Sequence, residues 1–308
     1  MKFEHIPVFL NEALDALRIN PDGVYVDCTA GGGGHSQEIL NRLSAKGRLL
    51  SIDRDPQAID ALKERFGSCE KVKIIHDNYS EIKNIVSDNG LEAVDGILVD
   101  LGVSSHQLDS VERGFSYHND APLDMRMSME GTSAYDIVNT WPQKALQKII
   151  YQYGEEKFAP AISKAIVKYR QNKPIESTVE LAEVIKSALP AAVRREGGHP
   201  ARKTFQAIRI EVNGEMEKLN TALEDMFDLL KPGGRLAVIS FHSLEDRVVK
   251  QTFNSFTVGC VCPRQFPVCV CGQKPRGVLP FKLIKPTQTQ IEENQRCRSA
   301  KLRCIEKN

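Results

Sequence analysis

Residues 24–55 read Val24-Tyr25-Val26-Asp27-Cys28-Thr29-Ala30, then four glycines from Gly31 to Gly34, then His35. After a helical stretch they continue as Arg48-Leu49-Leu50-Ser51-Ile52-Asp53-Arg54-Asp55. The pattern is strand, glycine loop, helix and strand, with an acid at the carboxyl end of the second strand. A strand-to-helix turn of this kind needs positive φ angles and lets a ligand approach the backbone closely. We therefore expect a site for a nucleoside-bearing cofactor at this turn.

The spacing of the glycines restricts the kind of cofactor. The dinucleotide fingerprint G-x-G-x-x-G needs a third glycine where this chain has Ser36 or Gln37. A pyrophosphate site is therefore disfavoured. Asp53 stands about 20 residues beyond the loop, where such folds bind a ribose hydroxyl. S-adenosyl-L-methionine has a ribose and no phosphate, and its cationic sulfonium suits acids such as Asp27 and Asp100.

The composition is that of a globular protein with one large or two ordinary domains. The chain has 308 residues, 41% hydrophobic and 26% charged, with a net charge of +1. The N-terminal residues lack the apolar stretch of a signal peptide, and no run approaches the roughly 18 apolar residues of a membrane span. We therefore expect a cytoplasmic protein with no membrane partner, whose eight cysteines are reduced.

Five apolar segments alternate with helical or loop stretches, which predicts a parallel sheet. The segments are apolar along almost their whole length, as strands covered by helices on both faces are. Their ranges are 24–28, 48–53, 72–76, 96–101 and 235–241. The predicted fold class is α/β, with a Rossmann-like, doubly wound sheet.

The spacing between the fourth and fifth strands indicates an insertion. About 130 residues separate these strands, whereas a whole βαβ unit takes roughly 30. Segments 143–172 and 178–192 have apolar residues at helical spacing. We therefore expect residues 105–212 to form an inserted helical domain, and residues 1–104 and 213–308 to form one discontinuous domain.

The segments after the insertion complete the discontinuous domain. A helix is predicted over 215–230 and ends at Lys231-Pro232-Gly233-Gly234, because proline and glycine stop helices. A second helix is predicted over 242–253. Segments 281–284 and 300–305 are expected to be closing strands.

Polar residues gather at the carboxyl ends of the predicted strands, which form the ligand-binding edge of an open α/β sheet. Turn formation and helix starts explain several of these residues, but Asp100 and His242 are better explained as functional. In strand order, the polar residues are Asp27, Asp53, His76, Asp77, Asn78, Tyr79, Asp100, Ser104, Ser105, Ser240, His242, Ser243, Glu245 and Asp246.

A set of short motifs runs in a fixed order along nearly the whole chain. The motifs are His5-x-Pro7-Val8, Gly32-Gly33-Gly34-His35-Ser36, Asp53-Arg54-Asp55-Pro56, Asp100-Leu101-Gly102-Val103-Ser104-Ser105, Gln107-Leu108-Asp109, Arg113-Gly114-Phe115-Ser116, Pro122-Leu123-Asp124-Met125-Arg126-Met127, Tyr153-Gly154-Glu155-Glu156, Thr204-Phe205-Gln206-Ala207-Ile208-Arg209 and Ser240-Phe241-His242-Ser243-Leu244-Glu245-Asp246-Arg247. As a set they are highly specific. The chain closely resembles the bacterial small-subunit (16S) ribosomal RNA (cytosine-N4)-methyltransferases.

This resemblance implies a fold, an activity and a substrate. The implied fold is that of a class I S-adenosylmethionine-dependent methyltransferase with a helical insertion that helps to bind substrate. The implied reaction is methylation of N4 of a specific cytidine in the decoding region of 16S ribosomal RNA, at the P site. The cofactor would be S-adenosyl-L-methionine, and the partner would be 16S ribosomal RNA within the small subunit, with no role for DNA.

The resemblance also implies roles for individual residues. Tyr79 takes the place of an aromatic residue that covers the adenine, where many relatives have Phe. No metal ion is assigned to the active site. The residues matching cofactor contacts are Gly33, Gly34, His35, Asp53, Tyr79, Asp100 and Gln107, and those expected to be catalytic are Asp100, His242 and Asp124.

The chemistry of N4 methylation asks for a proton acceptor. The N4 lone pair of cytosine is delocalised into the ring, so an acceptor near N4–H would localise it and take a proton. Asp100, His242 and Ser104 all remain candidates for this role. Leu101-Gly102-Val103 stands where many amino-methyltransferases have Pro-Pro-aromatic, which leaves the assignment open. No cysteine follows the fourth strand, so a covalent mechanism at C5 is disfavoured.

Candidate RNA contacts lie in the insertion and the C-terminal region. The segment from Thr257 onward has ten Lys and Arg against three Asp and Glu, which allows either RNA contact or a solvated surface. Asp124 and Arg126 could also read the edge of the base. The candidate stacking residues are Phe115, Tyr117, Trp141 and Phe205, and the candidate phosphate contacts are Arg194, Arg195, Arg202, Lys203 and Arg209.

Two C-x-C pairs, Cys260-Val261-Cys262 and Cys269-Val270-Cys271, stand apart from the other motifs. Four thiolates could hold zinc tetrahedrally, although the usual zinc ribbon has C-x-x-C. Free reduced thiols are the alternative. Relatives often lack the cluster, so a catalytic role is not expected.

Two other classes of protein share part of this pattern. A nicotinamide oxidoreductase would share the sheet, but the missing third glycine and the His242-Ser243 block disfavour it. A non-catalytic RNA-binding module would use the basic C-terminal region, but it would not need the cofactor loop.

Overall fold

The computed structural model describes residues 7–195, 198–263, 265, 267–268 and 270–308. Two residues of the predicted motifs, His5 and Cys269, lie outside this set. The chain divides into two compact units, which we call the sheet unit (Met1–Gly102 with Met216–Asn308) and the helical unit (Val103–Glu215). Among the described residues, no helix combines the length and apolar character needed to cross a membrane.

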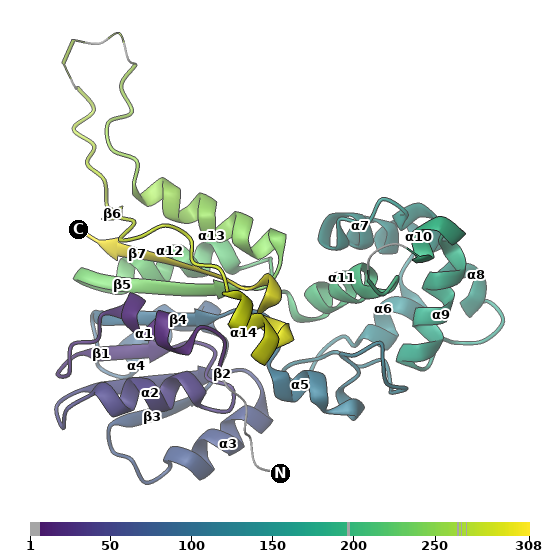
Figure 1. The fold of residues 1–308 in the computed structure, drawn as a ribbon, viewed down its shortest axis with the longest axis horizontal. Helices are drawn as coiled ribbons and strands as arrows, with labels where there is room; N and C mark the ends of the chain where they lie inside the picture. Colours follow the sequence, from purple (N-terminus) through teal and green to yellow (C-terminus); the bar gives the residue numbers. More distant parts are fainter. Residues whose placement is uncertain (1–6, 196–197, 264, 266, 269) are drawn as a thin grey trace. The chain divides into compact units, whose positions relative to one another are not determined.

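The sheet unit is built on one sheet, with strand order β3-β2-β1-β4-β5-β7-β6 over the described residues (Figure 1). The first five strands in this order pair in parallel, and β7 pairs antiparallel with both β5 and β6. The chain reverses its winding direction between β1 and β4, which is where open α/β sheets bind ligands. The strands are β1 (Val24–Asp27), β2 (Arg48–Asp53), β3 (Val72–His76), β4 (Val94–Asp100), β5 (Leu230–Ser240), β6 (Gly277–Val278) and β7 (Lys301–Lys307).

Helices cover both faces of this sheet. Successive strand residues point to opposite faces, so Ile97 packs with α4, α12 and α13, while its neighbour Leu98 packs with α1, α2 and α3. The predicted α/β doubly wound architecture is therefore confirmed. The helices of this unit are α1 (Leu10–Leu17), α2 (Gly34–Arg42), α3 (Pro56–Phe66), η1 (Tyr79–Glu81), α4 (Ile82–Asp88), α12 (Leu219–Leu229), α13 (Ser243–Phe256), α14 (Gln288–Glu293) and η3 (Gln295–Ser299).

Strand β7 is attached to the unit by charge as well as by backbone pairing. The Asp246 carboxylate on α13 accepts hydrogen bonds from Lys301 Nζ (2.6 Å) and Arg303 Nε (2.7 Å), both on β7. Arg276 similarly pairs with Asp228. Lys301 and Arg303 therefore help to hold the basic C-terminal region to the sheet unit.

The helical unit has its own buried core. Helices α7, α8, α9 and α11 contribute fully buried side chains such as Ile150, Ile166, Leu181 and Ile208 to one cluster. The helices of this unit are α5 (Ser105–Asp109), η2 (Val111–Arg113), α6 (Ala134–Thr140), α7 (Gln143–Gly154), α8 (Ala159–Arg170), α9 (Thr178–Ala188), α10 (Ala191–Arg195) and α11 (Arg202–Asn213).

Some predicted element boundaries are wrong. The single segment 143–172 is two helices, because Glu155 takes a positive φ of 47° and ends α7. Pro190 likewise separates α9 from α10. The predicted strand over 281–284 forms only a bridge from Ile284 to β7, and the strand beside β7 is β6 instead. The strand predicted over 235–241 starts earlier, since β5 begins at Leu230 directly after α12.

We expect Asp246→Asn to destabilise the sheet unit by about 1–3 kcal/mol, because two cations on β7 lose a charged acceptor. Burial opposes ionisation, but hydrogen bonds from Arg303 and Lys301 outweigh it and lower the pKa of Asp246. The stabilisation is therefore present at neutral pH and is lost as the pH falls through the lowered pKa. Urea unfolding at pH 7 and pH 3 measures this stabilisation. Far-UV circular dichroism is the suitable signal, because the single tryptophan of the sequence, Trp141, lies in the helical unit and does not report on the sheet unit.

The matched control is Asp225→Asn, which removes an acceptor whose partner Lys83 is half-exposed. A smaller loss of stability is expected there. An equal loss of unfolding free energy in the two variants would contradict this role of Asp246. So would a stability difference between Asp246→Asn and the parent protein that is as large at pH 3 as at pH 7.

Candidate functional site

The glycine loop and the end of β2 are joined by hydrogen bonds to one carboxylate. Gly31 N–H donates to Asp53 Oδ2 (2.8 Å), and Asp55 N–H donates to Asp53 Oδ1 (2.8 Å). Gly31 and Gly33 have φ angles of 52° and 80°. A Cβ on Gly33 would lie 2.7 Å from the Phe66 ring, whereas a Cβ on Gly31 would meet nothing within 4 Å. The loop therefore packs against Phe66 of α3 at Gly33, and it has open space at Gly31, beside Asp53.

The start of α2 is closely covered by the N-terminal segment. A Cβ on Gly34 would lie 2.3 Å from Pro7 Cγ, so only glycine fits there. The His35 imidazole is buried, with Nε2 3.2 Å from the carbonyl of Val8, and burial lowers its pKa to about 4. His35 is thus neutral and faces the N-terminal segment. What it can offer a ligand at the loop is its backbone N–H, which has no acceptor within the helix.

Asp27 organises the junction of β1, α2 and β4. Ser36 Oγ donates to Asp27 Oδ2 (2.7 Å), and the backbone N–H of Thr29 donates to Oδ1 (3.3 Å). Thr29 Oγ1 in turn accepts from Asp100 N–H (2.6 Å). Ser51 Oγ lies 2.9 Å from Ser36 Oγ. This network fixes the position of Asp100 relative to the loop.

Asp100 differs from the other two strand-end acids. Its backbone is held, but its Oδ1 is buried and has no hydrogen-bond partner. Burial raises the pKa of Asp100 well above its usual range, and the nearby carboxylates of Asp27 and Glu245 add to the rise. A buried acceptor without a partner is costly, so the geometry at Asp100 suits an incoming donor or cation.

Asp27 and Asp53 are also reluctant to ionise. Burial raises the pKa of each to about 6, and Asp27 adds its charge to the environment of Asp53. Together with Asp100, they place three carboxylates on adjacent strand ends of one sheet. A cationic ligand would relieve their mutual repulsion.

Tyr79 lies immediately beyond the same edge of the sheet, in the short helix η1. Asn78 caps this helix, since its Oδ1 accepts from Ser80 N–H (3.0 Å). Tyr79 is partly buried against the core beneath the sheet. The structure therefore places Tyr79 at the end of β3, two strands from Asp27.

His242 acts as a helix cap. Its Nδ1 accepts from Glu245 N–H (3.3 Å), and Glu245 Oε2 accepts from His242 N–H (3.2 Å). With Nδ1 used as an acceptor, the ring hydrogen lies on Nε2, which is 3.1 Å from Glu245 Oε1 and, like Asp100 Oδ1, is buried without a hydrogen-bond partner in the described part of the chain.

Two expected site residues lie in the helical unit. Gln107 is buried and completes the capping box of α5, accepting from Ser104 N–H (3.0 Å) while Ser104 Oγ accepts from Gln107 N–H (3.1 Å). Asp124 is paired with Arg126, whose Nε and terminal nitrogen donate to its carboxylate at 3.1 Å and 2.5 Å. The Asp124 carboxylate is therefore already occupied by a cation.

The segment Pro122–Met127 around Asp124 is rigidly held. Arg113 donates to the carbonyls of Arg126 and Met127 (both 2.9 Å). Asn213 accepts from Met127 N–H (2.8 Å) and donates to the carbonyl of Met125 (2.8 Å). Met125 itself has a positive φ of 60°. These bonds tie the Arg113–Ser116 and Pro122–Met127 motifs to each other and, through Asn213, to α11.

The candidate RNA contacts differ in their exposure and in the partners they already have. Phe115 and Phe205 are in the core, so they cannot stack on a base, whereas Tyr117 is only half-buried and stacks on His199 at 4.3 Å. Arg209 forms a two-bond ion pair with Glu215, so its guanidinium already has an anionic partner. The exposed cations among the candidates are Arg194, Arg195, Arg202 and Lys203.

Several residues that build the site were not predicted as site residues. Thr29, Ser36 and Glu245 hold Asp100, Asp27 and His242, and Arg113 and Asn213 hold the Asp124 segment. Polar residues within apolar stretches of the sequence could have indicated these residues, because a buried polar group must find a hydrogen-bond partner. Such a pattern predicts that the residue is hydrogen-bonded, but it does not identify the partner.

Comparison with known proteins agrees with this geometry. The sequence model of the MraW methylase family matches residues 2–308. Proteins named ribosomal RNA small subunit methyltransferase H from Clostridium botulinum (strain Kyoto / Type A2) and Brevibacillus brevis are 53% and 51% identical to this chain, over 100% of it and 100% and 99% of their own lengths. The chain therefore belongs to the MraW methylase family and is an S-adenosyl-L-methionine-dependent methyltransferase.

Proposed function

We propose that this methyltransferase modifies N4 of a specific cytidine in the decoding region of 16S ribosomal RNA, at the P site. Its relatives are named for ribosomal RNA of the small subunit, which supports the class of substrate. The substrate would be the assembled small subunit, in the cytoplasm. DNA and membranes have no part in this proposal.

The observation that carries the proposal is the unpartnered oxygen of Asp100. The amino group of cytosine donates hydrogen bonds and is a poor nucleophile, so methylation needs a basic acceptor beside it. Asp100 Oδ1 is a buried acceptor with no hydrogen bond of its own, and a bound cationic sulfonium would favour the ionised form of this carboxyl group. We assign Asp100 as the group that accepts the N4 hydrogen.

The other candidates are used elsewhere. His242 caps α13 through Nδ1, Ser104 caps α5 through Oγ, and Asp124 is paired with Arg126. Their roles in the proposal are therefore positional. His242 and Glu245 fix the turn after β5, and Asp124 fixes the segment that could meet the base through Arg126.

The cofactor site is assigned to the loop and the ends of β1, β2 and β4. S-adenosyl-L-methionine supplies the electrophilic methyl group when bound. Asp53 would hold the ribose hydroxyls, and the backbone of Gly33, Gly34 and His35 would line the open side of the loop. Tyr79 would cover the adenine, and Gln107 would supply a further contact. The three strand-end carboxylates suit a cation, so the residues present fit this cofactor.

The helical unit is proposed to bind the RNA. Its exposed cations, Arg194, Arg195 and Arg202, could neutralise phosphates. The stacked pair Tyr117 and His199 offers a partly exposed aromatic surface of the kind on which bases stack. Unpaired RNA, whose bases can leave the stack, is the form such a surface would recognise.

A strain lacking this protein tests the substrate directly. Mass mapping of its 16S ribosomal RNA is expected to show one decoding-region cytidine without its N4 methyl group. Small subunits from that strain should then accept a labelled methyl group from the purified enzyme better than naked 16S RNA does. An unchanged cytidine in the deletion strain would overturn the proposal.

Replacing Asp100 with Asn tests the assignment of the proton acceptor. The variant keeps shape but loses charge, so we expect kcat to fall by about 10²–10⁴-fold, the usual contribution of a general base. The affinity for S-adenosyl-L-methionine, measured by calorimetry, should change far less than kcat.

Asp95→Asn is the matched control, since Asp95 lies at the other end of β4 and accepts from Val24 N–H and Lys231. Its kcat should remain that of the parent enzyme. Near-normal turnover by Asp100→Asn would defeat the assignment.

Gly31→Ala tests the position of the cofactor. Gly31 and Gly90 both have positive φ (52° and 69°), and a Cβ on either would meet nothing within 4 Å. Alanine should therefore destabilise the protein by a similar amount, about 1 kcal/mol, at both positions. Only Gly31 lies beside Asp53, so only Gly31→Ala should weaken binding of S-adenosyl-L-methionine in calorimetry. Equal effects on binding would place the cofactor elsewhere.

A further inference from the structure

The chain makes a long excursion between α13 and β6, over residues 257–276. Figure 1 shows it leaving the end of α13 and returning to the edge of the sheet. The base of the excursion is fixed, because Arg276 N–H donates to the carbonyl of Phe256 (2.8 Å) and the Arg276 guanidinium lies 5.2 Å from the Phe256 ring centre. A Cβ on Gly259 would lie 3.3 Å from Pro275, so the two arms run side by side beyond the base.

Among the described residues of the excursion, no buried apolar side chain holds the arms together further out. The valines of the excursion are exposed, Val261 by 58%, Val268 by 70% and Val270 by 72%. Small structures that cannot form a core are usually stabilised by disulfides or a metal ion. The polar groups available for this purpose in the described part of the excursion are thiols.

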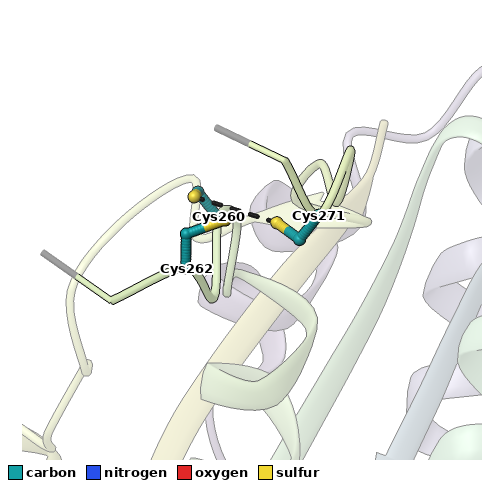
Figure 2. A group of neighbouring side chains, drawn as sticks. All are labelled: Cys260, Cys262 and Cys271. Atoms are coloured by element: carbon teal, nitrogen blue, oxygen red, sulfur yellow. Dashed lines mark hydrogen bonds between the residues drawn. The ribbon is translucent and has the colours of Figure 1, made fainter. Parts of the chain in front are cut away.

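Three of these thiols converge from the two arms. Cys260 and Cys262 lie on the outgoing arm and Cys271 on the returning arm, and their sulfur atoms all lie within 4.8 Å of one another (Figure 2). The Sγ atoms of Cys260 and Cys271 are 3.8 Å apart. Val270 N–H donates to Cys262 Sγ (3.3 Å), the kind of bond that stabilises a metal-bound thiolate.

The separation of the Cys260 and Cys271 sulfur atoms, 3.8 Å, is that of two corners of a tetrahedral zinc centre. With a Zn–S bond of about 2.3 Å, two thiolates at neighbouring corners of a tetrahedron are about 3.8 Å apart. A disulfide would need about 2.05 Å, and three converging thiols cannot all pair with one another. We propose that Cys260, Cys262 and Cys271 bind one Zn²⁺ ion, which ties the two arms together and has no part in the methyl transfer.

The choice of zinc follows from the ligands. Thiolates select soft or borderline ions, and zinc forms closed sulfur sites with a structural role. The centre lies on the excursion and not among the strand-end carboxylates, so cofactor binding should be independent of it. Loss of zinc should therefore leave cofactor binding unchanged, and a protein without zinc could still be the proposed methyltransferase.

Metal analysis of the full chain, purified without chelator or added zinc, is expected to find about one zinc per chain. Cobalt(II) added to metal-free protein should give the strong sulfur-to-cobalt charge-transfer and visible bands of a tetrahedral thiolate site. Cys260→Ser and Cys271→Ser should each weaken zinc binding at least tenfold in competition with a chromophoric chelator. Cys69→Ser, which alters a partly exposed thiol elsewhere in the sheet unit, should leave it unchanged.

A measurement on the unmodified protein guards against misfolded variants. Removing the metal with a chelator should speed hydrogen exchange at the Val270 amide, which bonds to Cys262 Sγ, and added zinc should slow it again, while affinity for S-adenosyl-L-methionine stays constant. Substoichiometric zinc with only weak octahedral cobalt bands would overturn the proposal. So would a Cys260–Cys271 disulfide in protein kept under reducing conditions, or equal loss of zinc in the Cys69 variant.

Discussion

Crowding of negative charge at one edge of the sheet is the constraint on which the site depends. Asp27, Asp53 and Asp100 end three adjacent parallel strands, and burial raises the pKa of each. Asp27 and Asp53 are stabilised by backbone N–H and hydroxyl donors, whereas Asp100 keeps one oxygen without a partner. These buried carboxyl groups destabilise the fold, and they favour binding of a cation and a hydrogen-bond donor at this edge of the sheet. A methyl donor with a sulfonium group and an acceptor with an amino group are the two ligands that such an edge suits.

The remaining polar residues near the motifs mostly position others. Glu245 and His242 cap the same helix turn, and the Arg126 side chain neutralises Asp124. Arg113 and Asn213 hold the Asp124 segment by bonding to backbone groups that no helix or strand satisfies. These charged residues fix geometry, whereas Asp100 Oδ1 has no hydrogen-bond partner among the described residues. Under the proposed assignment the family motifs combine one reacting carboxylate with supporting groups, and their spacing alone does not distinguish the two.

The sequence was sufficient for the architecture and for the strand-end acids, because apolar runs and glycine loops reflect local rules. The core strands β1 to β4 lie where they were predicted to within a few residues. The break at Glu155 was missed because a positive φ in a non-glycine residue is a consequence of tertiary packing. The strand predicted over 281–284 failed for a similar reason, since β7 pairs instead with β6. At the site, polarity indicated which residues are bonded, but only coordinates showed that Arg209 pairs with Glu215 or that His242 is a cap.

The pairing of β4 with β5 has a consequence for how the chain reaches its fold. These neighbours, paired from Val94 with Leu230 to Asp100 with Ile239, are separated in sequence by the whole helical unit. Contacts between residues so far apart form slowly, because the intervening chain must be closed into a loop first. The entropic cost of that closure grows only with the logarithm of loop length. The centre of the sheet therefore tolerates an entire folding unit as a connection, and the penalty falls on the speed of assembly rather than on the stability of the product.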